Sequence, residues 1–218
     1  MNHIDVKNTV IINAAGCGSR LGQQVPKSLV SVAGKPILEW QLTQQCQPHD
    51  RVRLVVGFKG EQVEALAKQI FPSIEVLFNY QWNETKTAAS LSLGASGLDG
   101  RCLSLDGDLL VHPSDFRELL SVDKNVIGVT DVKTSHPVYA SMNKQGLCHL
   151  LCYDVKTQFE WTGLVNFVAS EVPPCNDNVY QMISGIMPIN ARSVRCVEVD
   201  TPEDLEQANR LWPNFLEN

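Results

Sequence analysis

Short apolar runs and segments of helical spacing alternate along the first half of the chain. The run from Thr9 to Asn13 is β-branched and lies between polar residues and a glycine-rich segment, which is typical of a buried parallel strand. The same patterns predict strands at 51–57, 74–78 and 101–105, and helices at 37–46, 61–71 and 85–98. This alternation predicts an α/β fold with a doubly wound, mostly parallel, Rossmann-like sheet.

The middle of the chain has a different pattern, with four apolar runs separated by polar or glycine-containing turns. We expect these runs to be strands at 125–132, 138–143, 147–153 and 164–169. A last strand at 194–199 then leads into a helix, with Thr201 as its N-cap and Pro202 at its first position. The sequence predicts a single domain over 1–218, with a core at about 8–125 and 185–218 and a small β-rich extension at about 126–184.

Composition and charge narrow the class of protein. Hydrophobic residues make up 44% of the chain and charged residues 19%, which excludes a disordered chain. The net charge of −6 gives no field that would attract a nucleic acid, although a single nucleotide needs only a local cluster of donors. The N-terminal residues fit neither a signal peptide nor a membrane span, so we expect a cytoplasmic protein that binds no membrane.

The segment from Asn13 to Gly22 is rich in glycine and is followed closely by Lys27. Glycines let the backbone turn sharply and bring N–H groups close to phosphate oxygens, and Arg20 and Lys27 would supply positive charge. Taken alone, the pattern also fits a tight turn beside a solvated lysine. It lacks the third glycine of the dinucleotide-binding motif and the Gly-Lys-Ser/Thr of the ATPase phosphate loop.

Acidic residues stand at the ends of two predicted strands. Asp106 and Asp108 follow one strand, and Asp200 follows another near the other end of the sequence. Open α/β sheets bind ligands at the carboxyl ends of their strands, and magnesium prefers oxygen ligands. A turn with two solvated acids and simple helix capping are the structural alternatives for these residues.

The run from Asn13 to Leu42, with its AAGxGxRL, PK and GKP elements, resembles the signature of the nucleotidyltransferase superfamily. This superfamily includes sugar-1-phosphate nucleotidyltransferases, cytidylyltransferases and molybdenum-cofactor guanylyltransferases. The resemblance implies an enzyme that uses Mg²⁺ and a nucleoside triphosphate and releases pyrophosphate. It implies catalytic roles for Arg20 and Lys27, metal ligation by Asp108 and Asp200 with Asp106 as a weaker candidate, and nucleotide binding by Ala14, Ala15, Gly16, Gly18, Ser19, Thr87 and Ser90.

Two later segments resemble the phosphocholine-cytidylyltransferase-like branch of that superfamily. FNYQWNETKTAASLSLG is similar to its NPxYxxTNxxxSL stretch, and FEWTGLVNF to its E-aromatic-x-Gly element. Tyr80 stands where proline is usual and Lys86 where asparagine is usual, and an extra cation suits a phosphate, phosphonate or carboxylate group. The resemblance implies CTP as the preferred nucleotide and acceptor binding by the extension, through Trp82, Lys86, Glu160 and Trp161.

Two other functions stay open at this point. One is a sugar-1-phosphate nucleotidyltransferase that uses UTP, GTP or dTTP, and the other is a nucleotide-binding module without turnover. The expected partners are a nucleoside triphosphate and a small phosphorylated or phosphonate acceptor, and the sequence is compatible with a homodimer.

Overall fold

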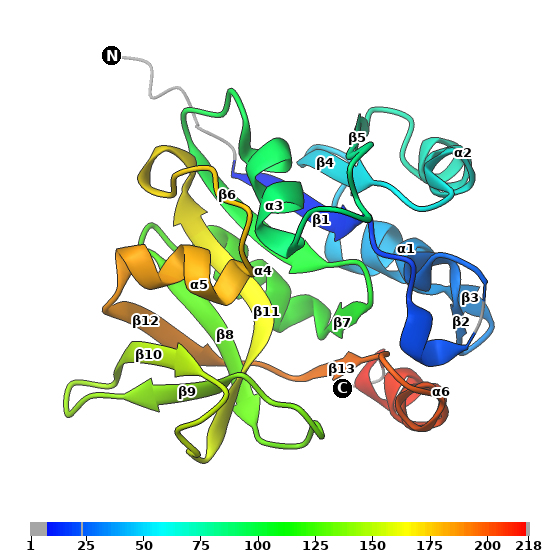
Figure 1. Cartoon of the computed structure of the whole chain (residues 1–218). Coiled ribbons are helices and arrows are strands. Elements are labelled where there is room, and N and C mark those ends of the chain that lie inside the picture. The colour runs from blue at the N-terminus through cyan, green and yellow to red at the C-terminus, as the bar shows by residue number, and fades with distance from the viewer. Residues whose placement is uncertain (1–7, 23, 217–218) are drawn as a thin grey trace.

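The computed structural model describes residues 8–22 and 24–216, which form one large mixed sheet with helices on both faces (Figure 1). In spatial order the strands are β5 (Glu75–Phe78), β4 (Arg51–Val56), β1 (Thr9–Ala14), β6 (Arg101–Asp106), β11 (Phe159–Val168), β8 (Val126–Asp131), β12 (Ile189–Ser193), β10 (Leu147–Cys152) and β9 (Tyr139–Met142). The predicted α/β class is confirmed.

Parallel pairing in this sheet is concentrated in its first half. β5, β4, β1 and β6 run parallel, whereas β11 lies antiparallel to both β6 and β8. The strands of segment 126–184 therefore pair into the same sheet as the core strands.

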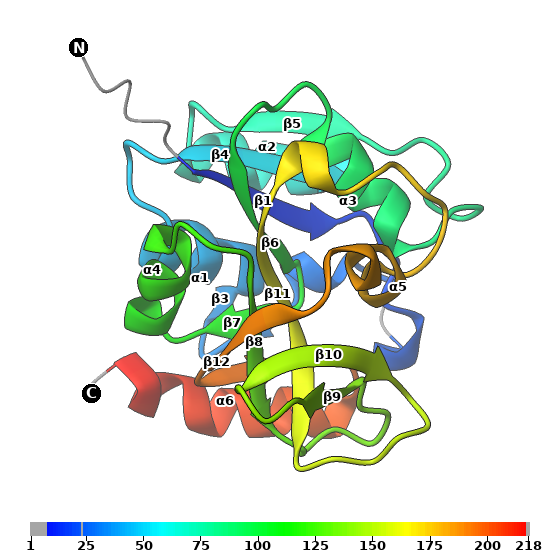
Figure 2. The ribbon, with the colours of Figure 1, turned by 90° about the vertical axis from the view of Figure 1, so that its left-hand side faces the viewer.

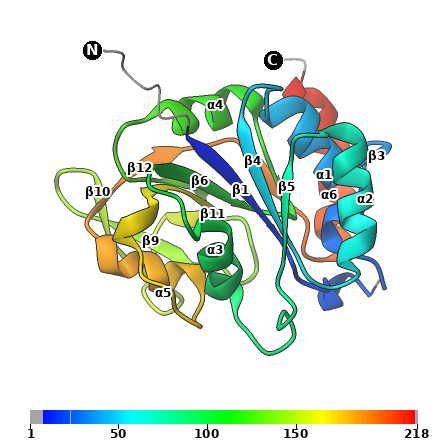
Figure 3. The ribbon, with the colours of Figure 1, turned by 90° about the horizontal axis from the view of Figure 1, so that it is seen from above.

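Helices cover both faces of the sheet because neighbouring strand residues point in opposite directions. Val10 and Ile12 pack on one side, and Ile11 packs on the other. Figure 3 shows the helices on the two sides of the sheet. The first side carries α1 (Ile37–Trp40) with a π-helical turn (Gln41–Gln45), α2 (Gly60–Ile70) and α4 (Pro113–Ser121), and the second carries α3 (Thr87–Ala95) and α5 (Val179–Ile183).

A third apolar cluster attaches the C-terminal helix α6 (Pro202–Leu216), which runs along the bottom of Figure 2. The Trp212 side chain is completely buried and meets Trp40 edge-on, with 6.0 Å between ring centroids. The cluster also contains residues of two small ribbons, β2 (Ser31–Val32) with β3 (Lys35–Pro36), and β7 (Leu109–Val111) with β13 (Cys196–Glu198). It thus joins the last helix to the segment that follows the glycine-rich turn.

The predicted start of the last helix is confirmed in detail. The Asp204 N–H donates to the Thr201 hydroxyl, and the Thr201 N–H donates back to the Asp204 carboxylate. The sequence patterns did not predict α4, α5, β7, β12 or the short strands β2 and β3, and they placed the start of β11 too late. Short 3-10 turns lie at Ser19–Leu21, Lys27–Leu29, Ala169–Glu171 and Ser184–Ile186. In the described part of the chain, every helix is too short or too polar to cross a bilayer.

Candidate active site

A cleft of about 470 Å³ opens at the ends of β1 and β6. The chain adds β4 and β5 on one side of β1 and then places β6 on its other side, so the order of strands switches between β1 and β6. Open α/β sheets bind ligands outside the carboxyl ends of their strands at such a point. Both strand ends line the cleft, through Asn13 and Ala14 of β1 and Asp106 of β6. The cleft thus lies where the sequence predicted a ligand site.

The glycine-rich turn after β1 forms one wall of the cleft. Ala14 and Ala15 are buried there, whereas a side chain at Gly16 would meet open space. Gly18 has φ +62° and lies against Lys27, so that a Cβ at Gly18 would come within 2.5 Å of the Lys27 Cγ. The small residue at position 18 therefore seats the Lys27 side chain beside the turn.

Lys27 lies at the centre of a group of charges from distant parts of the chain. Its Nζ atom is 2.7 Å from Oδ2 of Asp108, and it also donates to Oδ1 of Asp200. Arg20 reaches the second oxygen of Asp200 at 2.9 Å. Burial lowers the pKa of Lys27, but the charges and hydrogen bonds of Asp108 and Asp200 outweigh it and raise the pKa above its usual value.

The β7–β13 ribbon brings Asp108 and Asp200 together. Glu198 pairs with Leu109, and the Val199 N–H donates to the Asp108 carbonyl at 3.1 Å. Asp200 is further held by α6, because its N–H donates to the capping carboxylate of Asp204 at 3.2 Å. The two predicted carboxylates thus share the cleft with the glycine turn.

Glu198 is a member of this group that the sequence analysis missed. One carboxylate oxygen from each of Asp108, Glu198 and Asp200 lies within 4.8 Å of the others. Burial and the charges of Asp108 and Asp200 raise the pKa of Glu198 well above its usual value. A hard divalent cation would relieve this repulsion, and three carboxylates are the oxygen donors that Mg²⁺ prefers. The residues therefore fit a site for a hard divalent cation.

Asp106 lies beside this group, on the floor of the cleft. Burial, followed by the charge of Asp108, raises the pKa of its carboxyl to about 7. Gly163, with φ +85°, leaves space for Asp106, since a Cβ there would come within 2.7 Å of its Oδ2. The structure brings Asp106 to the cleft but not into the set of three carboxylates.

The other predicted residues fall into two groups. Thr87, Ser90 and Trp161 line the cleft, whereas Trp82, Lys86 and Glu160 do not. Trp82 packs behind Gly57 and against Phe58, with 5.3 Å between ring centroids, and Lys86 forms an exposed ion pair with Asp177 at 3.3 Å. The side chain of Ser19 lies outside the described part of the structure.

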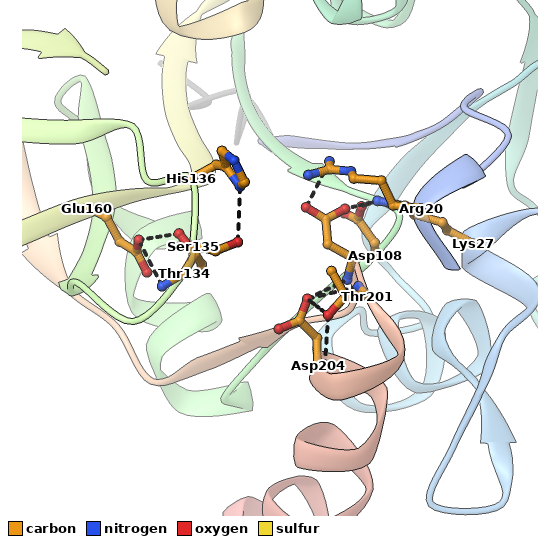
Figure 4. A network of polar contacts seen from close by, with 10 residues as sticks. Arg20, Lys27, Asp108, Thr134, Ser135, His136, Glu160, Thr201 and Asp204 are labelled. Carbon is orange, nitrogen blue, oxygen red and sulfur yellow. Dashed lines mark hydrogen bonds and ion pairs between the residues drawn. The ribbon is translucent and has the colours of Figure 1, made fainter. Parts of the chain in front are cut away.

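The wall opposite Arg20 and Lys27 is formed by residues that the sequence analysis did not select. Thr134, Ser135 and His136 face this charged group in Figure 4. Tyr153 and Tyr180 also line the cleft and contact each other edge-on at 5.4 Å between centroids. No motif in the sequence marks them, because they come from loops and from the start of a short helix.

Comparison with known proteins identifies one matching domain family and several relatives of similar sequence. Residues 10–157 match the MobA-like NTP transferase domain. The bifunctional protein GlmU of Acidithiobacillus ferrooxidans is 33% identical over 133 residues, 59% of this chain and 28% of GlmU. GlmU of Aliarcobacter butzleri is 25% identical over 121 residues, 56% of this chain and 28% of GlmU. The chain spans a little over a quarter of the length of these curated relatives.

Solved structures share the fold at low sequence identity. The CTP:phosphocholine cytidylyltransferase LicC of Streptococcus pneumoniae has a TM-score of 0.79 at 18% identity, over 94% of this chain and 99% of that chain. The inositol-1-phosphate CTP transferase of T. maritima has a TM-score of 0.74 at 18% identity, over 98% of both. A UDP-glucose pyrophosphorylase reaches 0.75 at 13% identity, over 95% of this chain and 98% of that chain. From the match over residues 10–157, more than half of its length, the chain belongs to the MobA-like NTP transferase domain family.

Proposed function

We propose that this protein is a Mg²⁺-dependent nucleotidyltransferase that transfers a nucleoside monophosphate from a triphosphate, preferably CTP, to a small phosphorylated or phosphonate acceptor. The observation that carries the proposal is the placement of Lys27 between Asp108 and Asp200, in one cleft with the glycine turn. Two anionic substrates repel each other, so an enzyme that joins them must supply positive charge where they meet.

The residues of the cleft suggest how the reaction proceeds. An oxygen of the acceptor attacks the α-phosphorus, the bond from that phosphorus to the α–β bridging oxygen breaks, and pyrophosphate leaves. The attacking oxygen is already ionised, so no base has to remove a proton. Arg20 and Lys27 exchange their carboxylate partners for phosphate oxygens and neutralise charge on the triphosphate. Asp108, Asp200 and Glu198 would hold Mg²⁺, which would supply further positive charge at the triphosphate.

The acceptor is expected on the side of the cleft that faces Arg20. We call this side the acceptor wall, formed by Thr134, His136, Val138, Tyr153, Trp161 and Tyr180. All six residues belong to the segment 126–184, which supports the prediction that this segment binds the acceptor. Lys86 forms an ion pair with Asp177 and does not line the cleft. The phosphate or phosphonate of the acceptor would therefore bind to Arg20 and Lys27 and not to Lys86.

The preference for CTP rests on two of the similar structures, which are described as cytidylyltransferases. The rival is a sugar-1-phosphate nucleotidyltransferase that uses UTP, GTP or dTTP, and the likeness to a UDP-glucose pyrophosphorylase supports it. The two candidate functions would use the same cleft, and they differ only in the base of the triphosphate and in the acceptor.

A substrate screen tests the proposal. The protein is incubated with Mg²⁺, with each ribonucleoside triphosphate or dTTP, and with a panel of phosphomonoesters, phosphonates and sugar phosphates, and pyrophosphate release is followed. We expect release to require both substrates and to be fastest with CTP. Faster release with another triphosphate would favour the rival. Absence of release in every combination, despite a rise in melting temperature with Mg²⁺ and a triphosphate, would leave a nucleotide-binding module.

A further inference from the structure

The loop formed by residues 132–138, here called the acceptor loop, connects β8 to β9 and carries Thr134 and His136 of the acceptor wall. Both flanking strands pair with β11 at the same point, since Glu160 lies opposite Thr130 of β8 and opposite Tyr139 of β9. Glu160 is therefore placed at the base of the loop, where the two strands separate.

The carboxylate of Glu160 is occupied by the acceptor loop. Its Oε1 accepts the Lys133 N–H at 3.2 Å, and its Oε2 accepts the Thr134 hydroxyl at 2.6 Å and the Thr134 N–H at 3.4 Å. The residue is only 2% exposed and does not line the cleft. Both oxygens are thus engaged by hydrogen-bond donors within the protein.

Other contacts hold the ends of the loop, and the Lys133 ammonium donates to the Cys196 carbonyl at 2.7 Å. The hydrogen bonds of Thr134, in contrast, are made to Glu160. The Val132 N–H donates to the Gln158 carbonyl at 3.1 Å, and the Val138 carbonyl accepts the Trp161 N–H at 2.8 Å. Between them, Ser135 and His136 are exposed to solvent. Hydrogen bonds to a buried carboxylate are among the stronger ones in proteins, so Glu160 restricts the loop where it faces the cleft.

We propose that Glu160 is a positioning residue that selects the acceptor without touching it. By fixing Thr134, it sets the distance of His136 from Arg20 across the cleft (Figure 4). The inference rests on the proposed function, because it assigns the acceptor to this side of the cleft. It replaces the expectation from the sequence that Glu160 itself binds the acceptor.

Four variants of the full chain test the proposal, with hydrogen exchange of the Lys133 and Thr134 amides and pyrophosphate-release kinetics as readouts. Glu160→Gln should speed exchange at both amides about tenfold or more and raise the acceptor KM about tenfold, with CTP affinity within about twofold. Thr134→Val should shift both readouts in the same direction but less, and the double variant should be no worse than Glu160→Gln. Glu171→Gln, the same change at a carboxylate outside the cleft, should match the wild type.

Two results would overturn the proposal. A raised acceptor KM with unchanged amide exchange would mean that Glu160 contacts the acceptor directly. Faster exchange with an unchanged KM would mean that the loop does not select the acceptor. If the wild type releases no pyrophosphate with any acceptor, the proposed function fails separately, and exchange in the unliganded protein still decides whether Glu160 orders the loop.

Discussion

The Nζ atom of Lys27 donates a hydrogen bond to Oδ2 of Asp108 across 2.7 Å, although the two residues are 81 positions apart in the sequence. Lys27 follows the glycine turn, and Asp108 lies between β6 and β7. Their contact joins the segment after the glycine turn to the clustered carboxylates, so the two parts of the candidate site hold each other in place.

Lys27→Ala should lower pyrophosphate release by a factor of about 100 to 1000, the usual cost of losing one group that stabilises developing charge. The fold should persist, because the lysine lies in the cleft and not in an apolar cluster. The measurement is the initial rate at saturating Mg²⁺ and triphosphate, together with circular dichroism. Lys124→Ala, at an exposed lysine outside the cleft, is the control and should retain full activity. Near-normal turnover of Lys27→Ala would remove the residue from the reaction.

Asp108→Asn and Asp200→Asn should each raise the Mg²⁺ concentration needed for half-maximal activity, because each removes a charged oxygen ligand. Glu198→Gln should do the same more weakly, since burial already opposes its ionised form. A magnesium titration of pyrophosphate release measures this, and Asp99→Asn on the exposed surface is the matched control. An unchanged titration for any one variant would exclude that residue from the metal site.

Gly18→Ala should reduce activity more than it reduces stability. The left-handed backbone at φ +62° costs alanine about 1–2 kcal/mol, and the new methyl group would push Lys27 from its place. Gly97→Ala is the matched control, because Gly97 has φ +68° but faces open space. We expect similar losses of unfolding free energy in urea for both, and loss of turnover only for Gly18→Ala. Equal activities would show that the contact with Lys27 is unimportant.

Trp161→Ala and Trp82→Ala should have different kinetic effects, the first on acceptor binding and the second on stability and triphosphate binding. Trp161 lines the cleft, so its loss should raise the acceptor KM. Trp82 supports Gly57 and Phe58 behind the glycine turn, so its loss should lower stability and triphosphate affinity instead. Steady-state kinetics with each substrate varied in turn distinguish the two effects. An acceptor KM that rises equally in both variants would contradict this division.

Acid should weaken the packing of β5 on β4 through Glu75. A hydrogen bond from the buried Arg53, at 2.9 Å, holds the pKa of Glu75 below its usual value. A carboxyl with a lowered pKa contributes stability above its unfolded-state pKa and loses it as the pH falls through its folded-state pKa. Since Glu75 is 43% exposed, the contribution should be below about 1 kcal/mol. Urea unfolding between pH 7 and pH 3 should therefore show a shallower loss of stability for Glu75→Gln, and identical slopes would refute the assignment.

The sequence predicted the parts of the site that follow regular strands. β1 and β6 are buried, β-branched or apolar runs, and the residues at their ends could be located from them. Glu198 was missed because a polar residue in a strand usually faces solvent, and only the pairing of β13 with β7 turns it into the cleft. Its spacing of two residues from Asp200 was the available signal, since such residues share a face of a strand.

The side chains expected at the acceptor were harder to place. Lys86 precedes the first residue of α3, where an ion pair with Asp177 was not visible from sequence. The residues that line the acceptor wall come from loops, whose course depends on long-range contacts such as those of Glu160.

The β7–β13 ribbon also determines when, during synthesis and folding, the protein can become active. During synthesis, the glycine turn, Lys27 and Asp108 emerge long before Glu198 and Asp200. A partly made chain would carry the glycine turn and Lys27 but only one of the three clustered carboxylates. Chemical activity would begin only when the last strand joins β7, so completion of folding and the onset of turnover would coincide.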